Sequence, residues 1–132
     1  MDNEKVTGYD LNKYCAVLAK EFDFATERGD ILKLHFNPQA GSEQAGYRPA
    51  MVISPIDYNR ISKLILVCPI TNRKKGWPFE VELPSMMQTT GVILVDQVTS
   101  IDCTTRGAVL IEKAPSPVVD EVLARLGPLL AQ

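Results

Sequence analysis

The residues with the clearest chemical potential lie in the decapeptide GSEQAGYRPA at positions 41–50, where Arg48 comes just before a proline and an apolar stretch. Its two glycines bracket a polar segment that contains Glu43 and Gln44. A guanidinium group offers fixed, bidentate donors that match a phosphate group. Arg48 and Glu43 belong to a larger set of polar residues at expected strand ends or in adjoining loops, where a small barrel can gather them at one rim. The other members are Thr71, Gln97, Ser100 and the basic run 73–75.

This set of side chains suits the cleavage of a phosphodiester, although it lacks a base that titrates near neutral pH. A cationic side chain and the Thr71 hydroxyl could stabilise the charge that builds up in a phosphorane-like transition state. RNA supplies its own nucleophile, the 2′-OH, so the protein need not carry one, whereas DNA lacks this group. The candidate chemistry is therefore RNA cleavage.

Other common kinds of site are not indicated. His35 is the only histidine, and the three cysteines are widely spaced, so no tetrahedral zinc site is expected. The segment GSEQAG lacks the P-loop pattern, no GxSxG elbow is present, and the acidic residues are spread over different loops. Cys15 and Cys68 fall in apolar patterns and are expected to be buried in a reducing cytosol. We therefore expect no metal and no cofactor.

The candidate residues also have structural interpretations that the residues alone leave open. Arg48 is equally compatible with a surface ion pair to Glu43. Thr71 follows a strand, where a threonine commonly serves as a turn residue. Gln97 and Ser100 could simply face solvent. On these arguments alone the chain is an RNA-binding barrel or a barrel with an ordinary polar surface.

Charge and composition describe a domain with a mildly basic middle. The chain has 132 residues and a net charge of −2, yet residues 31–111 hold eight bases and six acids. The basic run Arg73-Lys74-Lys75 permits a phosphate-binding patch and is also compatible with a solvated loop. Trp77 beside it is either a packing corner or a stacking platform for a single-stranded base. His35 is expected on the surface or in an interface.

The expected elements are several short strands between two helices. Apolar spacing predicts a helix at about 10–25. Ser116 is expected as the N-cap and Pro117 as the first residue of a final helix, which Gly127-Pro128 would end or kink. The expected strands are ILKLHF (31–36), AMVIS (50–54), LILVCPI (64–70, buried on both faces), FEVEL (79–83, with Glu80 and Glu82 outward), GVILVDQVTSI (91–101, one strand or two with a bend near Asp96) and AVLIE (108–112).

This order of elements predicts an α+β fold. Strands do not alternate with long helices, so a doubly wound parallel sheet is not expected. A small, partly closed antiparallel barrel with an N-terminal and a C-terminal helix fits best. No apolar run approaches the roughly 20 residues of a membrane span, and the polar start does not have the character of a secretory signal, so a cytoplasmic protein is expected.

Several motifs, in order, resemble one known family. They are GDILKLHFNPQAGSEQAGYRPAMVISP, YN, CPIT, KGWPFEVEL and GVILVDQVTSID, spread over roughly residues 29–130. In order and spacing they resemble the MazF/PemK (Kid) family of toxin endoribonucleases. The resemblance implies an SH3-like barrel that acts as a homodimer, with residues 29–132 as the toxin domain and residues 1–28 as an N-terminal extension.

The resemblance also implies a function and a set of site residues. It implies a toxin of a bacterial toxin–antitoxin pair that cuts single-stranded RNA at short sequences without metal, leaving a 2′,3′-cyclic phosphate and a 5′-hydroxyl. Arg48 matches the family's catalytic arginine, and Thr71 matches its catalytic threonine. Glu43 and Gln44 match a site loop that moves when RNA or antitoxin binds. The residues expected to bind substrate are Glu43, Gln44, Lys74, Lys75, Trp77, Gln97 and Ser100.

The chain departs from the family pattern at three positions. Cys103 stands where an aromatic residue is usual, Trp77 stands where tyrosine is common, and His35 replaces an acid. Two alternatives are a CcdB-like toxin that binds gyrase without cutting RNA, and an inactive barrel that only binds RNA or antitoxin. The CcdB-like chains lack the combination of GSEQAG…RPA with PIT…KGxPFEV that this chain carries.

Overall fold

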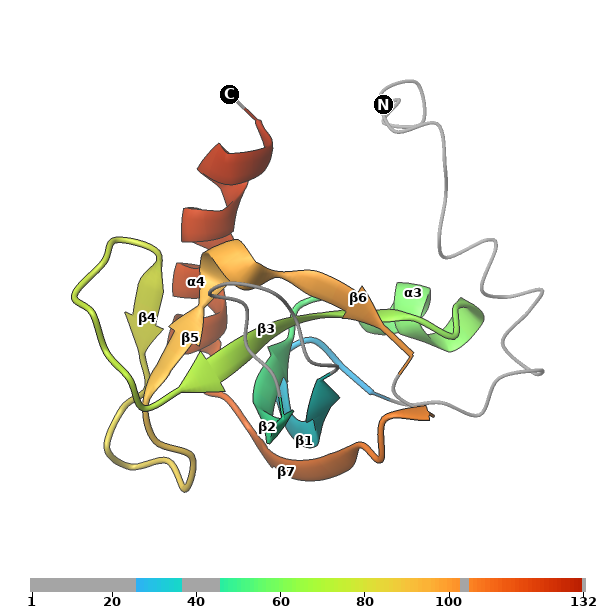
Figure 1. Cartoon of the computed structure of the whole chain (residues 1–132). Coiled ribbons are helices and arrows are strands. Elements are labelled where there is room, and N and C mark those ends of the chain that lie inside the picture. Colours follow the sequence, from blue (N-terminus) through green and yellow to red (C-terminus); the bar gives the residue numbers. More distant parts are fainter. Residues whose placement is uncertain (1–25, 37–45, 103–104, 132) are drawn as a thin grey trace.

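The computed structural model describes residues 26–36, 46–102 and 105–131, and this part forms one twisted antiparallel sheet flanked by two helices (Figure 1). The strand order is β4-β5-β3-β2-β1-β7, and β6 pairs with β3 beside this path. The strands are β1 (Asp30–Phe36), β2 (Gly46–Val52), β3 (Ile65–Thr71), β4 (Glu80–Glu82), β5 (Val92–Leu94), β6 (Thr99–Ile101) and β7 (Val109–Lys113). The predicted α+β class with a C-terminal helix is thus confirmed.

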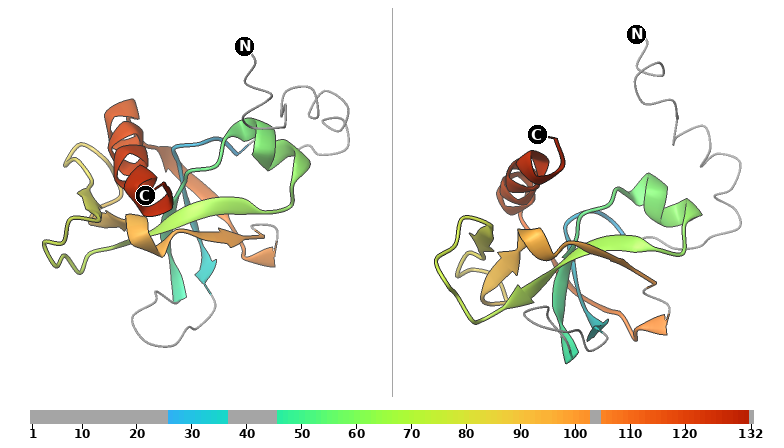
Figure 2. Two further views of the ribbon diagram at one scale, coloured as in Figure 1. Left: turned by 90° about the horizontal axis from the view of Figure 1, so that it is seen from above. Right: turned by 45° about the horizontal axis from the view of Figure 1, so that its top comes forward.

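The two faces of the sheet bury separate apolar clusters, because side chains alternate along each strand. Ile31 and Met51 belong to the larger cluster, which the helix α4 (Ser116–Leu130) covers with Val122. Leu34 belongs to the second cluster, which lies on the opposite side of β1. The views in Figure 2 agree that α4 stands beside β4 and β5, with the short helix α3 at the other end of the sheet.

The strand β3 runs through the middle of the sheet and uses one edge for two partners. Its first residues pair with β6 and its last two pair with β5, while its other edge pairs with β2 from Val67 to Pro69. Between β5 and β6 the chain turns through a short 3-10 helix, η2 (Val95–Gln97). Of the two interpretations of residues 91–101, the one with two strands and a bend near Asp96 is therefore confirmed.

The final helix differs from its prediction at both ends. The N–H groups of Val118 and Val119 donate to the Pro115 carbonyl, so the N-cap is Pro115, and the prediction of Ser116 was wrong by one residue. The helix also continues through Gly127 and Pro128 to Leu130. Pro128 removes a single N–H in the last turn, where little helix remains to be disrupted. No helix in the described residues is long and apolar enough to cross a membrane.

The strand boundaries contain three further corrections. β2 begins at Gly46 and not at Ala50, because β1 extends far enough to pair with the residues that looked like loop. β3 is not buried on both faces throughout, since Leu66 is exposed. Glu80 is buried, although the alternation of β4 predicted it to face solvent.

The thiol of Cys68 is buried as predicted and is chemically quiet. Its side chain is fully buried in the larger cluster. Burial, with a smaller contribution from the charge of Asp96, raises the pKa of this thiol to about 12, so the thiolate needed for nucleophilic attack is suppressed near neutral pH. Cys15, Cys103 and the predicted helix at 10–25 lie outside the described residues.

A buried asparagine ties α3 (Ile56–Ile61) to the rest of the fold. Asn59 is fully buried, and its amide nitrogen donates to the Thr26 carbonyl at 2.8 Å and to the Ser54 carbonyl at 3.1 Å. Its amide oxygen accepts a hydrogen bond from the Ser54 hydroxyl, which in turn accepts from Leu66 N–H at 3.0 Å. One side chain therefore joins the start of the described chain, α3 and β3.

We predict that Asn59→Ala lowers the free energy of unfolding by about 1–3 kcal/mol, because the partners of the amide lose their hydrogen bonds while they stay away from water. Urea unfolding followed by circular dichroism would measure the change. Arg60→Ala is the matched control, since its side chain is exposed on the same helix. Equal losses in the two variants would contradict the structural role assigned to Asn59.

Candidate active site

The two residues expected to be catalytic come from neighbouring strands at the same end of the sheet. In the register between β2 and β3, Ala50 pairs with Pro69 and Met51 pairs with Cys68. Continued by two residues, this register sets Arg48 opposite Thr71, on the face that Ala50 shares with the second apolar cluster. Both side chains are half-buried. The two residues therefore lie on neighbouring strands at the same end of the sheet.

The Thr71 hydroxyl is oriented by its own loop. It accepts a hydrogen bond from Arg73 N–H at 3.1 Å, which is the turn role that a threonine at a strand end was expected to have. A hydroxyl has one hydrogen to donate and two lone pairs, and this bond occupies one lone pair. The hydrogen can therefore be donated to an oxygen of a ligand, so the turn role and the proposed catalytic role are compatible.

A cleft opens beside Thr71, with a volume of about 220 Å³. This is smaller than a typical pocket for a drug-sized ligand, which measures about 300–1,000 Å³, and suits a single base or phosphate. Four residues predicted to bind substrate or act in catalysis line it together with others that the prediction did not include, and Arg48 is not among the lining residues. The lining residues are Thr71, Arg73, Lys75, Trp77, Glu80, Leu94, Asp96 and Gln97.

The basic run divides between two sides of its loop. Arg73 and Lys75 line the cleft. Lys74 instead forms an ion pair with Glu82, with 2.9 Å between Nζ and Oε1, and lines a different hollow. The hydrogen bond to Glu82, and then its charge, raise the pKa of Lys74. Successive residues of an extended segment point in opposite directions, which explains the split.

The indole of Trp77 lies at the mouth of the cleft, where two contacts hold it. Its Nε1–H donates to Asp96 Oδ2 at 3.3 Å, and its ring meets the edge of Phe79 with 5.6 Å between centroids. The side chain remains 47% exposed. About half of the side chain is therefore open to solvent, which leaves surface for contact with a base.

The remaining predicted site residues lie elsewhere or outside the described part. Ser100 is exposed on β6 opposite Leu66 and does not line the cleft. Glu43 and Gln44 are outside the described residues, so the suggested ion pair between Glu43 and Arg48 is not tested. His35 is exposed, as expected, and the centroid of its ring lies 4.4 Å from the centroid of the Tyr47 ring.

Sequence reasoning missed two acidic residues of the cleft, Glu80 and Asp96, and did not count Arg73 among the substrate-binding residues. The alternation of the loop could have paired Arg73 with Lys75, since residues two apart share a side. Nothing local in the sequence marks Glu80 as buried. Among the described residues, no three His, Cys, Asp or Glu side chains are grouped so that they could hold a metal ion.

Comparison with known proteins gives the chain a family. Residues 27–130 match the family described as PemK-like, MazF-like toxin of type II toxin–antitoxin system. The chain belongs to this family.

Curated relatives of this MazF-like toxin are named as endoribonucleases. The endoribonuclease toxin MazF of Escherichia coli K12 is 47% identical over 85 residues, covering 64% of this chain and 76% of the relative. The endoribonuclease PemK of Escherichia coli is 38% identical over 108 residues, covering 79% and 81%. The motifs that resembled the MazF/PemK family thus indicated the correct family.

Solved structures of MazF proteins share the fold. The crystal structure of MazF from Deinococcus radiodurans has a TM-score of 0.78 and 44% identity, covering 83% of this chain and 100% of that one. A MazE–MazF crystal structure from the same organism (Form-II) has a TM-score of 0.74 and 44% identity, covering 83% and 99%. The antiparallel sheet and C-terminal helix of this toxin are therefore the MazF-like fold.

We predict that Gly91→Ala disturbs Thr71 directly. Gly91 has a φ of +114°, and an added Cβ would lie 2.3 Å from the Thr71 carbonyl oxygen, so the β3 end must shift. Gly107→Ala is the matched control, because Gly107 also has a positive φ, of +63°, but its added Cβ would meet only a ring carbon of His35 at 3.5 Å, an ordinary contact. The melting temperature and the rate of RNA cleavage should both fall further in Gly91→Ala. A smaller effect than that of Gly107→Ala would contradict the close packing.

Proposed function

We propose that the cleft beside Thr71, together with Arg48, is where this endoribonuclease toxin binds and cuts single-stranded RNA, at short sequences and without a metal. The observation that supports the proposal is the register of β2 and β3, whose continuation by two residues beyond the Ala50–Pro69 pair would put the guanidinium of Arg48 and the hydroxyl of Thr71 on one face. The cations Arg73 and Lys75 in the adjoining cleft give it the charge that a phosphate backbone requires.

In the proposed reaction, the 2′-oxygen of the substrate attacks the neighbouring phosphorus and the bond from phosphorus to the 5′-oxygen breaks. The 2′-OH gives up its proton and the departing 5′-oxygen takes one up, in exchange with water. The products are a 2′,3′-cyclic phosphate and a 5′-hydroxyl. The guanidinium of Arg48 acts as a cationic hydrogen-bond donor and not as a proton-transfer group. Its role is to donate to the phosphoryl oxygens as charge builds up on them, and the Thr71 hydroxyl adds one more donor.

The cleft residues bind the RNA strand on either side of the reacting phosphate. Arg73 and Lys75 contact phosphates, Trp77 stacks on a base, and Gln97 hydrogen-bonds a base edge. These roles rest on the lining of the cleft and on the exposure of the indole. Lys74 and Ser100 lie outside the lining, so their contacts with RNA fall on its flanks.

The loop that contains Glu43 and Gln44 completes the site, as the family resemblance implies. Cleavage of messenger RNA would inhibit translation and growth, which is the action of a toxin in a toxin–antitoxin pair.

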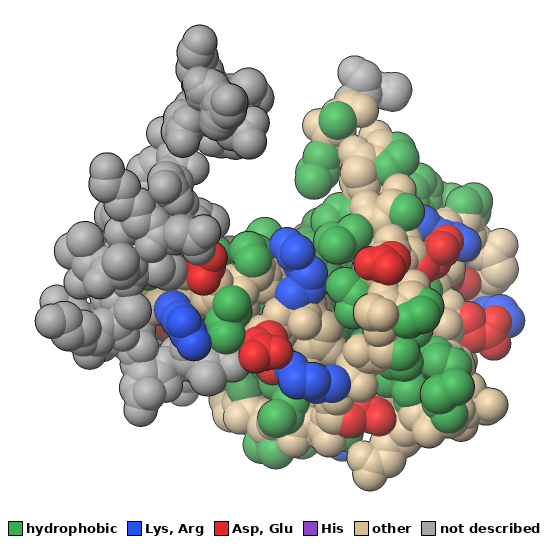
Figure 3. All heavy atoms as spheres, turned by 180° about the vertical axis from the view of Figure 1, so that it is seen from behind, with side chains coloured by type: hydrophobic (Ala, Val, Ile, Leu, Met, Phe, Trp, Pro, Cys, Tyr) green, Lys and Arg blue, Asp and Glu red, His purple; other side chains and the backbone are tan. Residues whose placement is uncertain are grey.

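The proposed partners are an antitoxin and a second copy of the chain, in the cytoplasm. The MazE–MazF structures of Deinococcus radiodurans support the first, since those toxins are seen with an antitoxin. An acidic antitoxin segment would pair with the cations of the cleft and fold as it binds. Exposed apolar side chains support a homodimer, among them Val109 and Leu110 on β7 and Leu130 on α4. Figure 3 shows apolar side chains gathered around the C-terminal end of α4.

We predict that Arg48→Ala lowers the rate of RNA cleavage about 10²- to 10³-fold, the usual loss when one donor to a developing oxyanion is removed. A labelled single-stranded RNA would report the rate, and analysis of the product ends would identify the cyclic phosphate. Arg60→Ala is the control, because it removes an exposed arginine on α3, away from the cleft. Thermal unfolding of each variant establishes that it is folded.

An Arg48→Ala variant that cuts RNA as fast as the parent protein would contradict the mechanism. Binding of RNA by the parent protein without cleavage products would indicate an inactive barrel. Inhibition of gyrase without RNA cleavage would indicate a CcdB-like activity instead.

We predict that the RNA complex is more sensitive to salt than the antitoxin complex. RNA binding through Arg48, Arg73 and Lys75 should weaken on the order of tenfold between 50 and 200 mM salt. Binding releases counterions from the strand, and this release becomes less favourable as the salt concentration rises. Apolar contacts with the antitoxin do not share this dependence. Fluorescence anisotropy with an uncleavable 2′-deoxy strand and with an antitoxin peptide would compare the two. Equal salt slopes would contradict the prediction, because the antitoxin complex would then depend on charge as much as the RNA complex does.

A further inference from the structure

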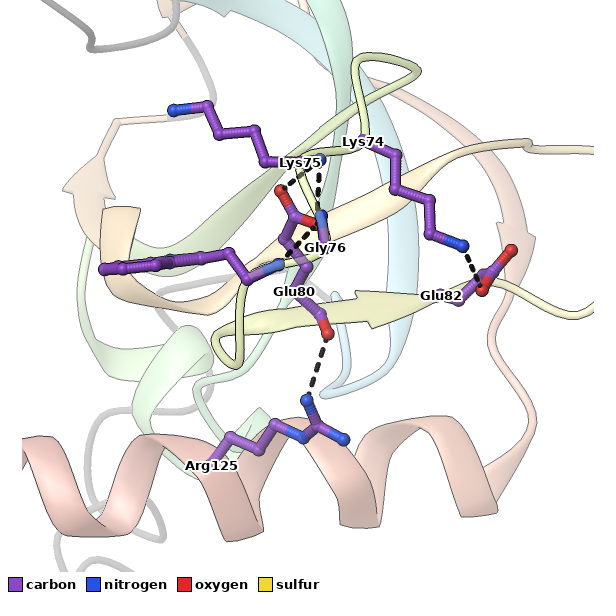
Figure 4. A network of polar contacts seen from close by, with 7 residues as sticks. Lys74, Lys75, Gly76, Glu80, Glu82 and Arg125 are labelled. Atoms are coloured by element: carbon purple, nitrogen blue, oxygen red, sulfur yellow. Dashed lines mark hydrogen bonds and ion pairs between the residues drawn. The ribbon is translucent and has the colours of Figure 1, made fainter.

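The carboxylate of Glu80 is the one acidic group of β4 that is turned into the protein. Glu80 and Glu82 share a side of the strand by alternation, but the loop 72–79 folds over the first and leaves the second exposed. The loop therefore decides the burial of Glu80, which retains only 8% of its accessible surface. Figure 4 shows this carboxylate directed at the loop backbone.

Three consecutive backbone N–H groups donate to this single carboxylate. Lys75 N–H lies 3.1 Å from Oε2, Gly76 N–H lies 3.0 Å from Oε1, and Trp77 N–H lies 3.4 Å from Oε1. Successive N–H groups that converge in this way form a nest, a concavity that binds anions. Gly76 supplies the positive φ of +77° that the turn needs. The loop is thus built around an internal anion.

The carboxylate of Glu80 is charged at neutral pH. Burial by itself raises its pKa, but hydrogen bonds from the backbone N–H groups of Lys75, Trp77 and Gly76, with the charge of Lys75, more than offset this and lower the pKa below its ordinary value. These bonds are therefore charge-assisted, and bonds of this kind are stronger than neutral ones.

The helix α4 holds the other side of the same turn. Arg125 Nη1–H donates to the Pro78 carbonyl at 2.6 Å and to the Glu80 carbonyl at 3.1 Å, and Arg125 is itself fixed by Glu121 at 2.7 Å. In Figure 4 the guanidinium of Arg125 reaches from α4 to the backbone of Glu80. The backbone of Glu80 is therefore bound to α4, while its side chain binds the N–H groups of the loop.

We propose that Glu80 is a positioning residue of the RNA site, whose carboxylate holds the 75–77 turn so that Lys75 and Trp77 face the cleft. The proposal rests on the proposed function, because it gives the RNA strand as the ligand of those two side chains. Lys74 and Lys75 leave the loop in different directions in Figure 4, and only Lys75 lines the cleft. Alternation sends the two lysines to opposite sides of the segment, and the nest fixes the turn so that Lys75 is the one on the side of the cleft.

The test compares Glu80→Gln with Glu82→Gln. Glutamine keeps the size of the side chain but loses the charge and replaces one acceptor oxygen with an amino group. The control removes the same charge two residues along β4, where Glu82 is exposed and pairs with Lys74. Both variants are measured as full-length protein for thermal unfolding, for KM and kcat with a single-stranded RNA, and for fluorescence.

The fluorescence measurement reports on the turn itself, because Trp77 is the only tryptophan of the chain. We expect Glu80→Gln to increase acrylamide quenching of Trp77 in the absence of RNA. We also expect KM to rise about tenfold, the loss that corresponds to one charge-assisted hydrogen bond, with a smaller change in kcat. Glu82→Gln should leave quenching, KM and kcat close to those of the parent protein.

Unchanged quenching and unchanged KM in Glu80→Gln would overturn the proposal, as would equal changes in the Glu82→Gln control. A lower melting temperature alone, with both kinetic constants unchanged, would also overturn it. If Glu80→Gln does not fold, amide hydrogen exchange in the parent protein decides. The N–H groups of Lys75, Gly76 and Trp77 should then exchange at least tenfold more slowly than that of Lys74, and equal rates would refute the nest.

These outcomes are separate from a failure of the proposed function. Quenching and amide exchange are measured without RNA, so they test the positioning even if Arg48→Ala shows that the cleft does not cut RNA. Conversely, loss of cleavage in Arg48→Ala with no effect of Glu80→Gln would keep the function and reject the positioning role.

Discussion

The structure depends on the way in which the central strand β3 changes partners. It pairs with β2 as far as Pro69 and with β5 from Ile70 onward. Pro49 and Pro69 stand on the two strands at the point where this pairing ends, and neither has an N–H to add to the ladder. Arg48 and Thr71 come directly after this point. From there Arg48 pairs with Leu34 on β1 and Thr71 pairs with Val92 on β5, so each is held by a different neighbouring strand.

The same change of partner brings the rest of the cleft to Thr71. Because β3 shares one edge between β5 and β6, the chain must turn between those strands, and that turn carries Asp96 and Gln97 to the cleft. On the other side, the backbone of Gly91 lies so close to the Thr71 carbonyl that the Cβ of any other residue type would clash with it. The loop 72–79 then closes over Glu80. The cleft is therefore a consequence of strand pairing, with the loops adding its charged and aromatic side chains.

The charges of the proposed RNA cleft differ from what the net charge of the chain suggests. The net charge of the chain is −2, but two of the acids at the cleft serve other groups. Glu80 accepts from the loop backbone, and Asp96 accepts from the Trp77 indole. These two carboxylates are therefore partnered by hydrogen-bond donors of the protein itself, while Arg73 and Lys75 border the open volume of the cleft. Local arrangement decides the ligand here, and net charge does not.

Sequence alone determined the family, the α+β class, most strand positions and the two residues proposed to act on the phosphate, because motifs and periodicity are local properties of the chain. It placed the start of β2 too late and predicted that Glu80 is exposed. Both features depend on another segment, because β1 pairs with β2 as far as Gly46 and the loop 72–79 covers Glu80. Only the tertiary structure decided which of two adjacent lysines borders the cleft, and that Trp77 is oriented by Asp96. Alternation tells which residues share a side, but the fold of the neighbouring segment decides what that side meets.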